Sequence, residues 1–150
     1  MTSAVQPQLL LDNQLCFLAY RLHRGITDLY RPILGELGLT YPQYLVMLVL
    51  WEEESATVGR LGERLHLDSG TLSPLLKRLE ATGFVARTRS REDERSVEVA
   101  LTAEGRDLRS RALDVPARMG ACLAADADQY WAVRAELEAL VSRVDAALGD

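Results

Sequence analysis

The sequence predicts a mainly α-helical fold with one small β-hairpin, and three patterns in its 150 residues support this. Apolar residues recur every three or four positions over several stretches, which is the spacing of helices with one buried face. Thr and Asp side chains stand directly before several of these stretches, where such side chains cap helices. Alternating apolar and polar residues are found in two short neighbouring segments, which is typical of paired strands.

The first two helices are expected in the N-terminal third of the chain. Apolar residues at helical spacing predict one long amphipathic helix over about residues 9–30. Pro32 lacks an amide donor and disfavours a helical residue before it, so the helix should kink or stop there. Thr40 and Gln43 have the spacing of a capping box and predict a second helix over about 41–53. Its run LVMLVLW is apolar on nearly every side, so this helix is expected to be the buried centre.

A short third helix and a longer fourth helix follow. Thr57 can cap the third helix, and the run DSGTLSPLLKRLEATG predicts the fourth, with Gly83 as its C-cap. The start of the fourth helix is ambiguous. Asp68 is a good N-cap, but Ser73 followed by Pro74 is also a good pair of cap and first helical residue. A proline six residues into a helix would normally disturb it.

The alternating segments 84–88 and 97–101 predict a β-hairpin whose tip is the charged segment RSREDERS. Thr102 then caps another helix, which Pro116 interrupts or ends, and a last helix covers about 126–148. Helix, short helix, turn, helix and charged hairpin is the element order of a winged helix-turn-helix. The sequence therefore predicts a mainly α winged helix-turn-helix with a small β-hairpin wing, flanked by N- and C-terminal dimerisation helices.

Charge and composition narrow the choice of compartment and partner. The net charge is −5, but residues 60–111 hold 11 of the 17 Lys and Arg against 9 Asp and Glu, so this region is mildly basic. Such a centre is compatible with local DNA contact. Cys16, Cys122, His23 and His66 form no recognisable zinc spacing, so neither a metal nor a cofactor is expected. Without an apolar run of membrane length or a basic signal region, the protein is expected in the cytoplasm, where thiols stay reduced.

An exposed fourth helix would fit the major groove of DNA, while a basic hairpin tip reaches the adjoining minor groove. Small hydroxyl side chains allow close approach, cationic side chains contact phosphates or bases, and an aspartate at the tip can orient a neighbouring arginine. The candidate DNA contacts are Ser69, Thr71, Ser73, Lys77 and Arg78 on the helix, with Arg91, Asp93 and Arg95 at the tip. The alternative is that these charges form only a solvated helix face and a hydrophilic turn.

Four segments now carry a specific resemblance: LCFLAY, LYRPILGELGLTYPQYLVMLVLWE, LHLDSGTLSPLLKRLEATGFVAR and DERSVEVALTAEG. The chain resembles the MarR family of dimeric winged-helix regulators and, within it, the organic-hydroperoxide-sensing subfamily usually called OhrR. DERSV and LTAEG are typical of the broad family, and LCFLAY with LTYPQYLVMLVLWE of the peroxide-sensing branch. The resemblance implies that the fourth helix starts at Asp68. We expect one compact protomer with dimerisation and sensing in 1–34, DNA binding in 35–103 and dimerisation helices in 104–150.

Helical geometry limits what Cys16 can meet. Tyr20 lies one turn from it on the same face. Tyr30 lies 14 residues on, about 21 Å along the axis, so it cannot touch Cys16 of its own chain. In a two-fold dimer, an equivalent helix running the other way can bring Tyr30 of one chain to Cys16 of the other. If Asp12 caps the helix, Cys16 also lies near its positive end.

The resemblance implies that Cys16 is the peroxide-reactive thiol, hydrogen-bonded by Tyr20 and the partner's Tyr30, which favours the thiolate. It also implies that Cys122 of the opposite subunit forms a disulfide with oxidised Cys16. The poorly patterned segment MGACLAADAD suits a mobile segment that travels to Cys16. The alternatives are that Cys16 only fills a helix face and that Cys122 has no redox role.

The sequence therefore predicts a homodimeric repressor, not an enzyme, that binds double-stranded operator DNA when reduced and releases it when organic hydroperoxide oxidises Cys16. The first alternative is a MarR-type repressor released by a non-covalent phenolic ligand. A second is a thiol peroxidase, but the sequence contains no CxxC, nucleophile elbow or HExxH motif that would support an enzyme. A third is a protein-interaction domain, which would show no salt-dependent affinity for DNA.

Overall fold

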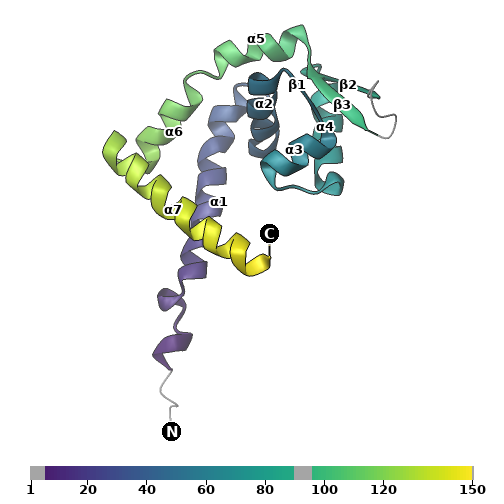
Figure 1. Ribbon diagram of the computed structural model, residues 1–150. Coiled ribbons are helices and arrows are strands. Elements are labelled where there is room, and N and C mark those ends of the chain that lie inside the picture. The colour runs from purple at the N-terminus through teal and green to yellow at the C-terminus, as the bar shows by residue number, and fades with distance from the viewer. Residues whose placement is uncertain (1–5, 90–95, 150) are drawn as a thin grey trace. The chain divides into compact units, whose positions relative to one another are not determined.

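The computed structural model describes residues 6–89 and 96–149, which divide into two compact units. The first unit ends at Ala112 and the second begins at Leu113, and each is described by itself (Figure 1). The elements of the first are η1 (Pro7–Leu9), η2 (Leu11–Asn13), α1 (Leu15–Gly35), α2 (Tyr41–Glu53), β1 (Ser55–Thr57), α3 (Val58–Leu65), α4 (Ser69–Ala81), β2 (Val85–Arg89), β3 (Val97–Leu101) and α5 (Ala103–Arg111). The second holds α6 (Val115–Leu123) and α7 (Ala127–Leu148). The predicted mainly helical class with a small β element is confirmed.

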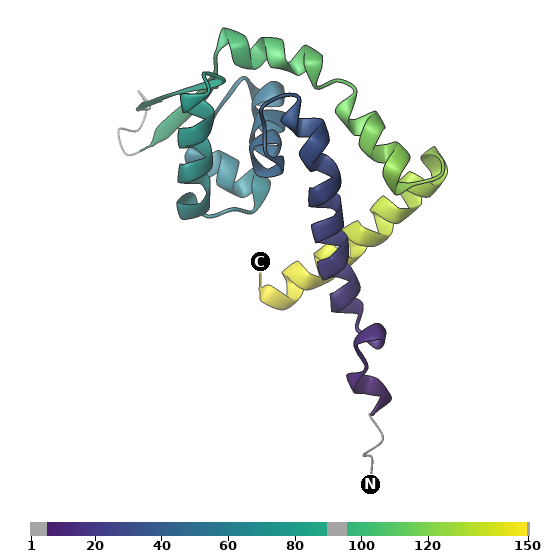
Figure 2. The ribbon, with the colours of Figure 1, turned by 180° about the vertical axis from the view of Figure 1, so that it is seen from behind.

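Helix α1 differs from its prediction at both ends. It begins at Leu15, after two short 3-10 turns, and Gln14 is its N-cap residue without a side-chain capping bond. Asp12 lies in the second 3-10 turn and does not cap the helix. Of the two expected outcomes at Pro32, a kink or a stop, the stop is wrong, because α1 continues to Gly35. Proline removes only one amide donor there, and the next turn is held by Ile33 and Leu34, which are buried. Helix α1 contacts α2 (Figure 2).

Helix α2 is the buried centre of the first unit, as predicted. Its capping box is present, with the amide of Thr40 donating to Oε1 of Gln43 at 2.9 Å. Met47 and Leu50 are fully buried. Trp51 donates from Nε1 to the carbonyl oxygen of Gly105 at 2.8 Å, which joins α2 to α5.

Caps also define α3 and α4. Oγ1 of Thr57 accepts from the amide of Arg60 at 3.1 Å, and Oδ1 of Asp68 accepts from the amide of Thr71 at 2.8 Å. Helix α4 therefore starts after Asp68, as the resemblance implied, and Pro74 lies inside it. The simple proline rule fails here because Leu72, Leu76 and Leu79 are buried on both sides of Pro74. Gly83 follows the helix with φ of 83°, in the left-handed region that favours glycine.

The sheet has the order β1-β3-β2, and both pairings are antiparallel. Strands β2 and β3 form the predicted hairpin, in which Arg87 lies opposite Val99. Strand β1, where Ser55 pairs with Ala100, was not predicted, because three residues are too few to show alternation. The tip residues Arg91, Asp93 and Arg95 lie outside the described residues.

Helices α5 and α7 also begin at capping side chains, of which Thr102 was predicted and Asp126 was not. Oγ1 of Thr102 accepts from the amide of Gly105 at 3.1 Å, and Oδ1 of Asp126 caps α7 through the amide of Gln129 at 2.8 Å. Helix α5 ends at Arg111, before Pro116, which lies in the first turn of α6. Of the segment 119–128 around Cys122, which was expected to be mobile, residues 119–123 form the end of α6 and 127–128 form the start of α7. The small residues of this segment give no amphipathic pattern by which a helix could be recognised.

Candidate nucleic-acid interface and thiol site

Helix α4 presents one polar face to solvent. Leu72, Leu76 and Leu79 are buried on the opposite face and fix its orientation. The exposed side chains include all five helical candidates for DNA contact: Ser69, Thr71, Ser73, Lys77 and Arg78. The predicted hydroxyl and cationic groups are therefore free of the core and lie along one helix.

Asp68 does more than begin this helix. Besides its bond to the amide of Thr71, its Oδ2 accepts from Oγ1 of Thr71 at 3.0 Å. These two hydrogen bonds from Thr71 lower the pKa of Asp68 below its usual range. The hydroxyl proton of Thr71 is thus directed to Asp68, which leaves the hydroxyl oxygen to accept a hydrogen bond from a ligand.

A salt bridge links α4 to the hairpin and was not predicted. Arg87 of β2 donates from Nε and Nη2 to Oε2 of Glu80 at 2.9 and 2.6 Å, and its amide donates to Oε1 at 3.3 Å. The hydrogen bond from Arg87 lowers the pKa of Glu80. Because the two residues are seven positions apart and in different elements, no local spacing rule relates them.

Consecutive glutamates at the end of α2 bind arginines of the neighbouring helix α3. Glu52 pairs with Arg64 at 2.7 Å, and Glu53 pairs with Arg64 and, at 3.0 Å, with Arg60. The hydrogen bond from Arg60 and then the one from Arg64 lower the pKa of Glu53. The positive charge of α3 is therefore largely balanced by the end of α2.

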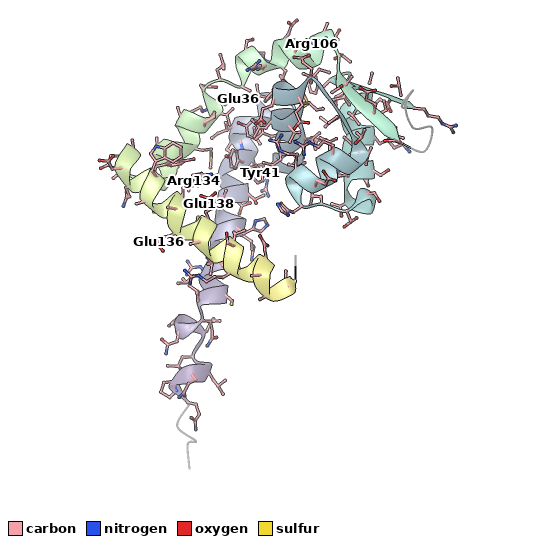
Figure 3. The ribbon with its side chains drawn as sticks, viewed as in Figure 1. Glu36, Tyr41, Arg106, Arg134, Glu136 and Glu138 are labelled. Carbon is pink, nitrogen blue, oxygen red and sulfur yellow. The ribbon has the colours of Figure 1, made fainter. Side chains whose placement is uncertain are left out.

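Arg106, labelled on α5 in Figure 3, pairs with Glu54 at 2.7 Å. Among the described residues of the basic region 60–111, Arg106 is one of four arginines that bind carboxylates within the unit, with Arg60, Arg64 and Arg87. The charge of that region therefore overstates what is available to DNA. Lys77 and Arg78, both exposed on α4, are therefore the stronger candidates for cationic contacts with DNA.

Cys16 is the second residue of α1, and its side chain is exposed. Tyr20, one turn further on, is 57% exposed, and the guanidinium of Arg24 lies 5.7 Å from the centre of its ring. Thiol and phenol thus share an open part of the helix, and Cys16 lies closer to the helix start than the sequence suggested.

Tyr30 faces an aromatic cluster of its own chain. Its ring stacks on that of Tyr41, with centroids 4.4 Å apart and planes 24° apart, and lies 6.0 Å from the ring of Tyr44. Tyr44 in turn meets Trp51 edge-on at 6.2 Å. Burial raises the pKa of both Tyr41 and Tyr44, so these phenols are held neutral. Figure 3 labels Tyr41, whose stacking contact the sequence did not reveal.

Cys122 is exposed in the last turn of α6, and both cysteines are free thiols. Ala121 beside it lines a groove of about 570 Å³ within the second unit, to which Tyr130 and Trp131 of α7 contribute. Across residues 6–89 and 96–149, no cluster of three His, Cys, Asp or Glu side chains is arranged to hold a metal ion. Within the same ranges, none of the helices has both the length and the apolar character needed to span a bilayer.

Comparison with known proteins identifies the family of the chain. Residues 28–111 match the family described as transcriptional regulator SarA/Rot. The organic hydroperoxide resistance transcriptional regulator of Bacillus subtilis is 55% identical over 106 residues, which cover 71% of this chain and 72% of that protein. The chain belongs to the SarA/Rot family of MarR-like winged-helix transcriptional regulators. The resemblance seen in the sequence is confirmed.

Solved structures agree with this assignment. The regulator superposes on reduced AbfR bound to DNA with a TM-score of 0.83 and 36% identity, covering 95% of this chain and 98% of that one. AbfR, a protein of Staphylococcus epidermidis, is also known overoxidised and bound to DNA (TM-score 0.74, 38% identity, 91% and 96% covered) and in a disulfide form (0.65, 36%, 95% and 95%). MarR itself matches with a TM-score of 0.71 and 26% identity over 85% of this chain and 94% of that one. The SarA/Rot regulator is thus a DNA-binding transcriptional regulator by family.

Proposed function

We propose that this regulator is a homodimeric repressor that binds operator DNA while Cys16 is reduced and releases it when an organic hydroperoxide oxidises Cys16. One observation carries the proposal: Cys16 is a free, exposed thiol in the first turn of α1, one turn before Tyr20. The relative from Bacillus subtilis, with 55% identity, is named for organic hydroperoxide resistance. In this proposal, residues 1–34 sense and dimerise, 35–103 bind DNA and 104–150 complete the dimer.

The proposed reaction needs one thiol to reduce the peroxide and a second thiol to form the disulfide. The Cys16 thiolate attacks one peroxide oxygen, the O–O bond breaks, and the alkoxide leaves and takes a proton to become an alcohol. Cys16 is then a sulfenic acid. The thiolate of the partner's Cys122 attacks its sulfur and expels hydroxide, which gives a disulfide. Both thiols are exposed, so each is open to these reactions.

In the proposed dimer, the second chain supplies the Tyr30 phenol to Cys16. Tyr30 lies about 21 Å along α1 from Cys16 and stacks on Tyr41, so it cannot support the thiol of its own chain. Large apolar side chains are exposed around the start of α1 and along α7, as expected of surfaces that pack against another copy. They are Leu9, Leu10, Leu11, Leu15, Leu18 and Leu22, and Trp131, Val133, Leu137, Val141, Val144 and Leu148.

Release of DNA is attributed to the disulfide rather than to oxidation of the sulfur alone. The names of the AbfR structures support this distinction, since that protein is known both overoxidised with DNA and in a separate disulfide form. In a dimer, the α4 helices of the two chains must lie about 34 Å apart, so that both can enter the major groove on the same side of the DNA, one helical turn apart. A bridge that pulls α1 and α6 of opposite chains together would change that spacing and lower DNA affinity.

The test compares wild type with Cys16→Ser and Cys122→Ser, each bound to DNA selected from a random duplex library. One equivalent of cumene hydroperoxide should release DNA from the wild type and produce a covalent dimer in non-reducing electrophoresis. Cys122→Ser should form no covalent dimer, and Cys16→Ser should keep its DNA. Release from Cys16→Ser, or release by salicylate without peroxide, would refute the redox proposal and favour a non-covalent ligand. Repeated peroxide turnover with a thiol reductant would indicate a peroxidase.

A further inference from the structure

A cleft lies between α4 and the base of the hairpin. It has a volume of about 470 Å³ and is lined by Ser73 of α4, Arg87 of β2 and Ser96 directly before β3, with Leu76 and Val97 as apolar lining. The first turn of α3 borders it through Val58 and Gly59. Figure 1 shows these elements side by side within the first unit.

The polar groups of this cleft are mainly hydrogen-bond donors. Glu80 accepts from Nε and Nη2 of Arg87, and no residue within 6–89 and 96–149 accepts from Nη1, whose two N–H groups can bind another acceptor. The hydroxyls of Ser73 and Ser96 can each donate one hydrogen bond. The amides of Val58 and Gly59 are in the first turn of α3, where amides have no acceptor within the helix. Such a set favours an anion.

The charge balance indicates which kind of anion fits. Glu80 already neutralises much of the charge of Arg87, because the two form a salt bridge with a 2.6 Å contact. An acceptor with one delocalised negative charge and two free oxygens is therefore better matched than a dianion. A phosphodiester of a nucleic-acid backbone has that charge and those oxygens.

We propose that the cleft holds one backbone phosphodiester of bound DNA, with Ser73, Arg87 and Ser96 as its positioning residues. This rests on the proposed function and on the groove contacts expected from the sequence, in which α4 enters the major groove and the hairpin tip enters the adjoining minor groove. A single sugar-phosphate strand separates those two grooves, so it passes over the space between α4 and the hairpin. A contact there fixes how deep α4 and the hairpin sit, without reading base sequence.

The first experiment measures the salt dependence of DNA affinity for the reduced dimer. It compares Glu80→Gln with the double variant Glu80→Gln/Arg87→Gln, so that neither protein carries an unpaired carboxylate at position 80. The dimer loses one phosphate contact in each half-site, so the slope of log affinity against log salt should fall by about 2. Between 50 and 200 mM salt, the double variant should therefore lose roughly twelvefold less affinity than Glu80→Gln. Arg109→Gln, an exposed arginine of α5 outside the cleft, is the control with an unchanged slope.

The second experiment removes the charge from the DNA instead. Each phosphate of the selected duplex is replaced in turn by a neutral methylphosphonate. At one position in each half-site, the replacement should weaken Glu80→Gln but leave the double variant unaffected, and Ser73→Ala with Ser96→Ala should reduce the same difference. Circular dichroism melting checks that every variant is folded.

The outcomes separate this inference from the proposed function. Equal slopes, or methylphosphonate effects that are the same in both proteins at every position, overturn the phosphate site while leaving a DNA-binding repressor. Absence of DNA binding by reduced wild type overturns both. If the reduced protein binds DNA but peroxide does not release it, only the redox mechanism is overturned.

Discussion

At the scale of single residues, Gly105 shows how closely α5 approaches the hairpin. Its carbonyl accepts the hydrogen bond from Trp51, and its Cα faces the carbonyl oxygen of Phe84. That oxygen also accepts from the amide of Thr102 at 3.1 Å, so it is held in place. A β-carbon at Gly105 would lie 2.1 Å from it. Only glycine allows this approach.

We predict that Gly105→Ala lowers the free energy of unfolding by about 1–3 kcal/mol, because backbone must move to admit the methyl group. Gly25→Ala is the matched control, since Gly25 is also inside a helix but has no atom within 4 Å of the place that a methyl group would take. It should raise stability by about 1 kcal/mol, the usual gain of alanine over glycine in a helix. Urea denaturation measures both, and equal midpoints for the two variants would contradict the role of Gly105.

At the scale of elements, the start of α4 depends on the carboxylate of Asp68. This side chain accepts hydrogen bonds from the amide and the hydroxyl of Thr71, and these lower its pKa. A depressed pKa in the folded state means that ionised Asp68 stabilises the fold above its unfolded pKa of about 4. That contribution is lost as the pH falls through the lower folded-state pKa.

The corresponding prediction concerns Asp68→Asn, which keeps a capping oxygen but cannot ionise. Wild type should be more stable than Asp68→Asn at pH 6, and this difference should disappear as the pH falls from about 4 to below the folded-state pKa. Glu53 and Glu80 also have lowered pKa values, but they are common to both proteins and cancel in the difference. Denaturation curves between pH 2.5 and pH 7 provide the measurement. A difference that is constant with pH would show that ionised Asp68 contributes nothing.

At the scale of the whole molecule, the two units leave apolar surface exposed that a partner chain would cover. No residue of α7 is buried, although it has Leu137, Val141, Val144 and Leu148 on one stripe. Figure 3 labels Arg134 and Glu138 on this helix, which form an ion pair at 3.0 Å. The stripe is therefore available for association, and the proposed redox site needs the partner's Tyr30.

We predict that Val144→Glu, which places a charge on this stripe, shifts the dimer toward monomers and weakens DNA binding. Ser142→Glu adds the same charge about 160° away around the helix, at 100° per residue, and should leave the dimer intact. Sedimentation equilibrium measures the association, and a fluorescence anisotropy titration measures DNA affinity. If Val144→Glu dimerises as tightly as Ser142→Glu, α7 is not part of the interface.

Most of the fold could be predicted from local patterns. The capping residues Thr40, Thr57 and Thr102 each precede the helix expected of them, and Asp68, one of two candidate caps, precedes α4. A cap is satisfied by amides two or three residues ahead, so its outcome depends little on the rest of the chain. For the same reason, the one-turn spacing of a thiol and a phenol in α1 could be read from the sequence.

The helices other than α6, the hairpin and the family of this regulator therefore follow from its sequence alone. Tertiary structure decides whether a proline ends a helix: α1 and α4 continue through Pro32 and Pro74 because buried neighbours outweigh one lost hydrogen bond. It also paired Glu80 with Arg87 and stacked Tyr30 on Tyr41. These contacts join different elements, and their free energy depends on where the chain brings each partner, which no spacing along the sequence specifies.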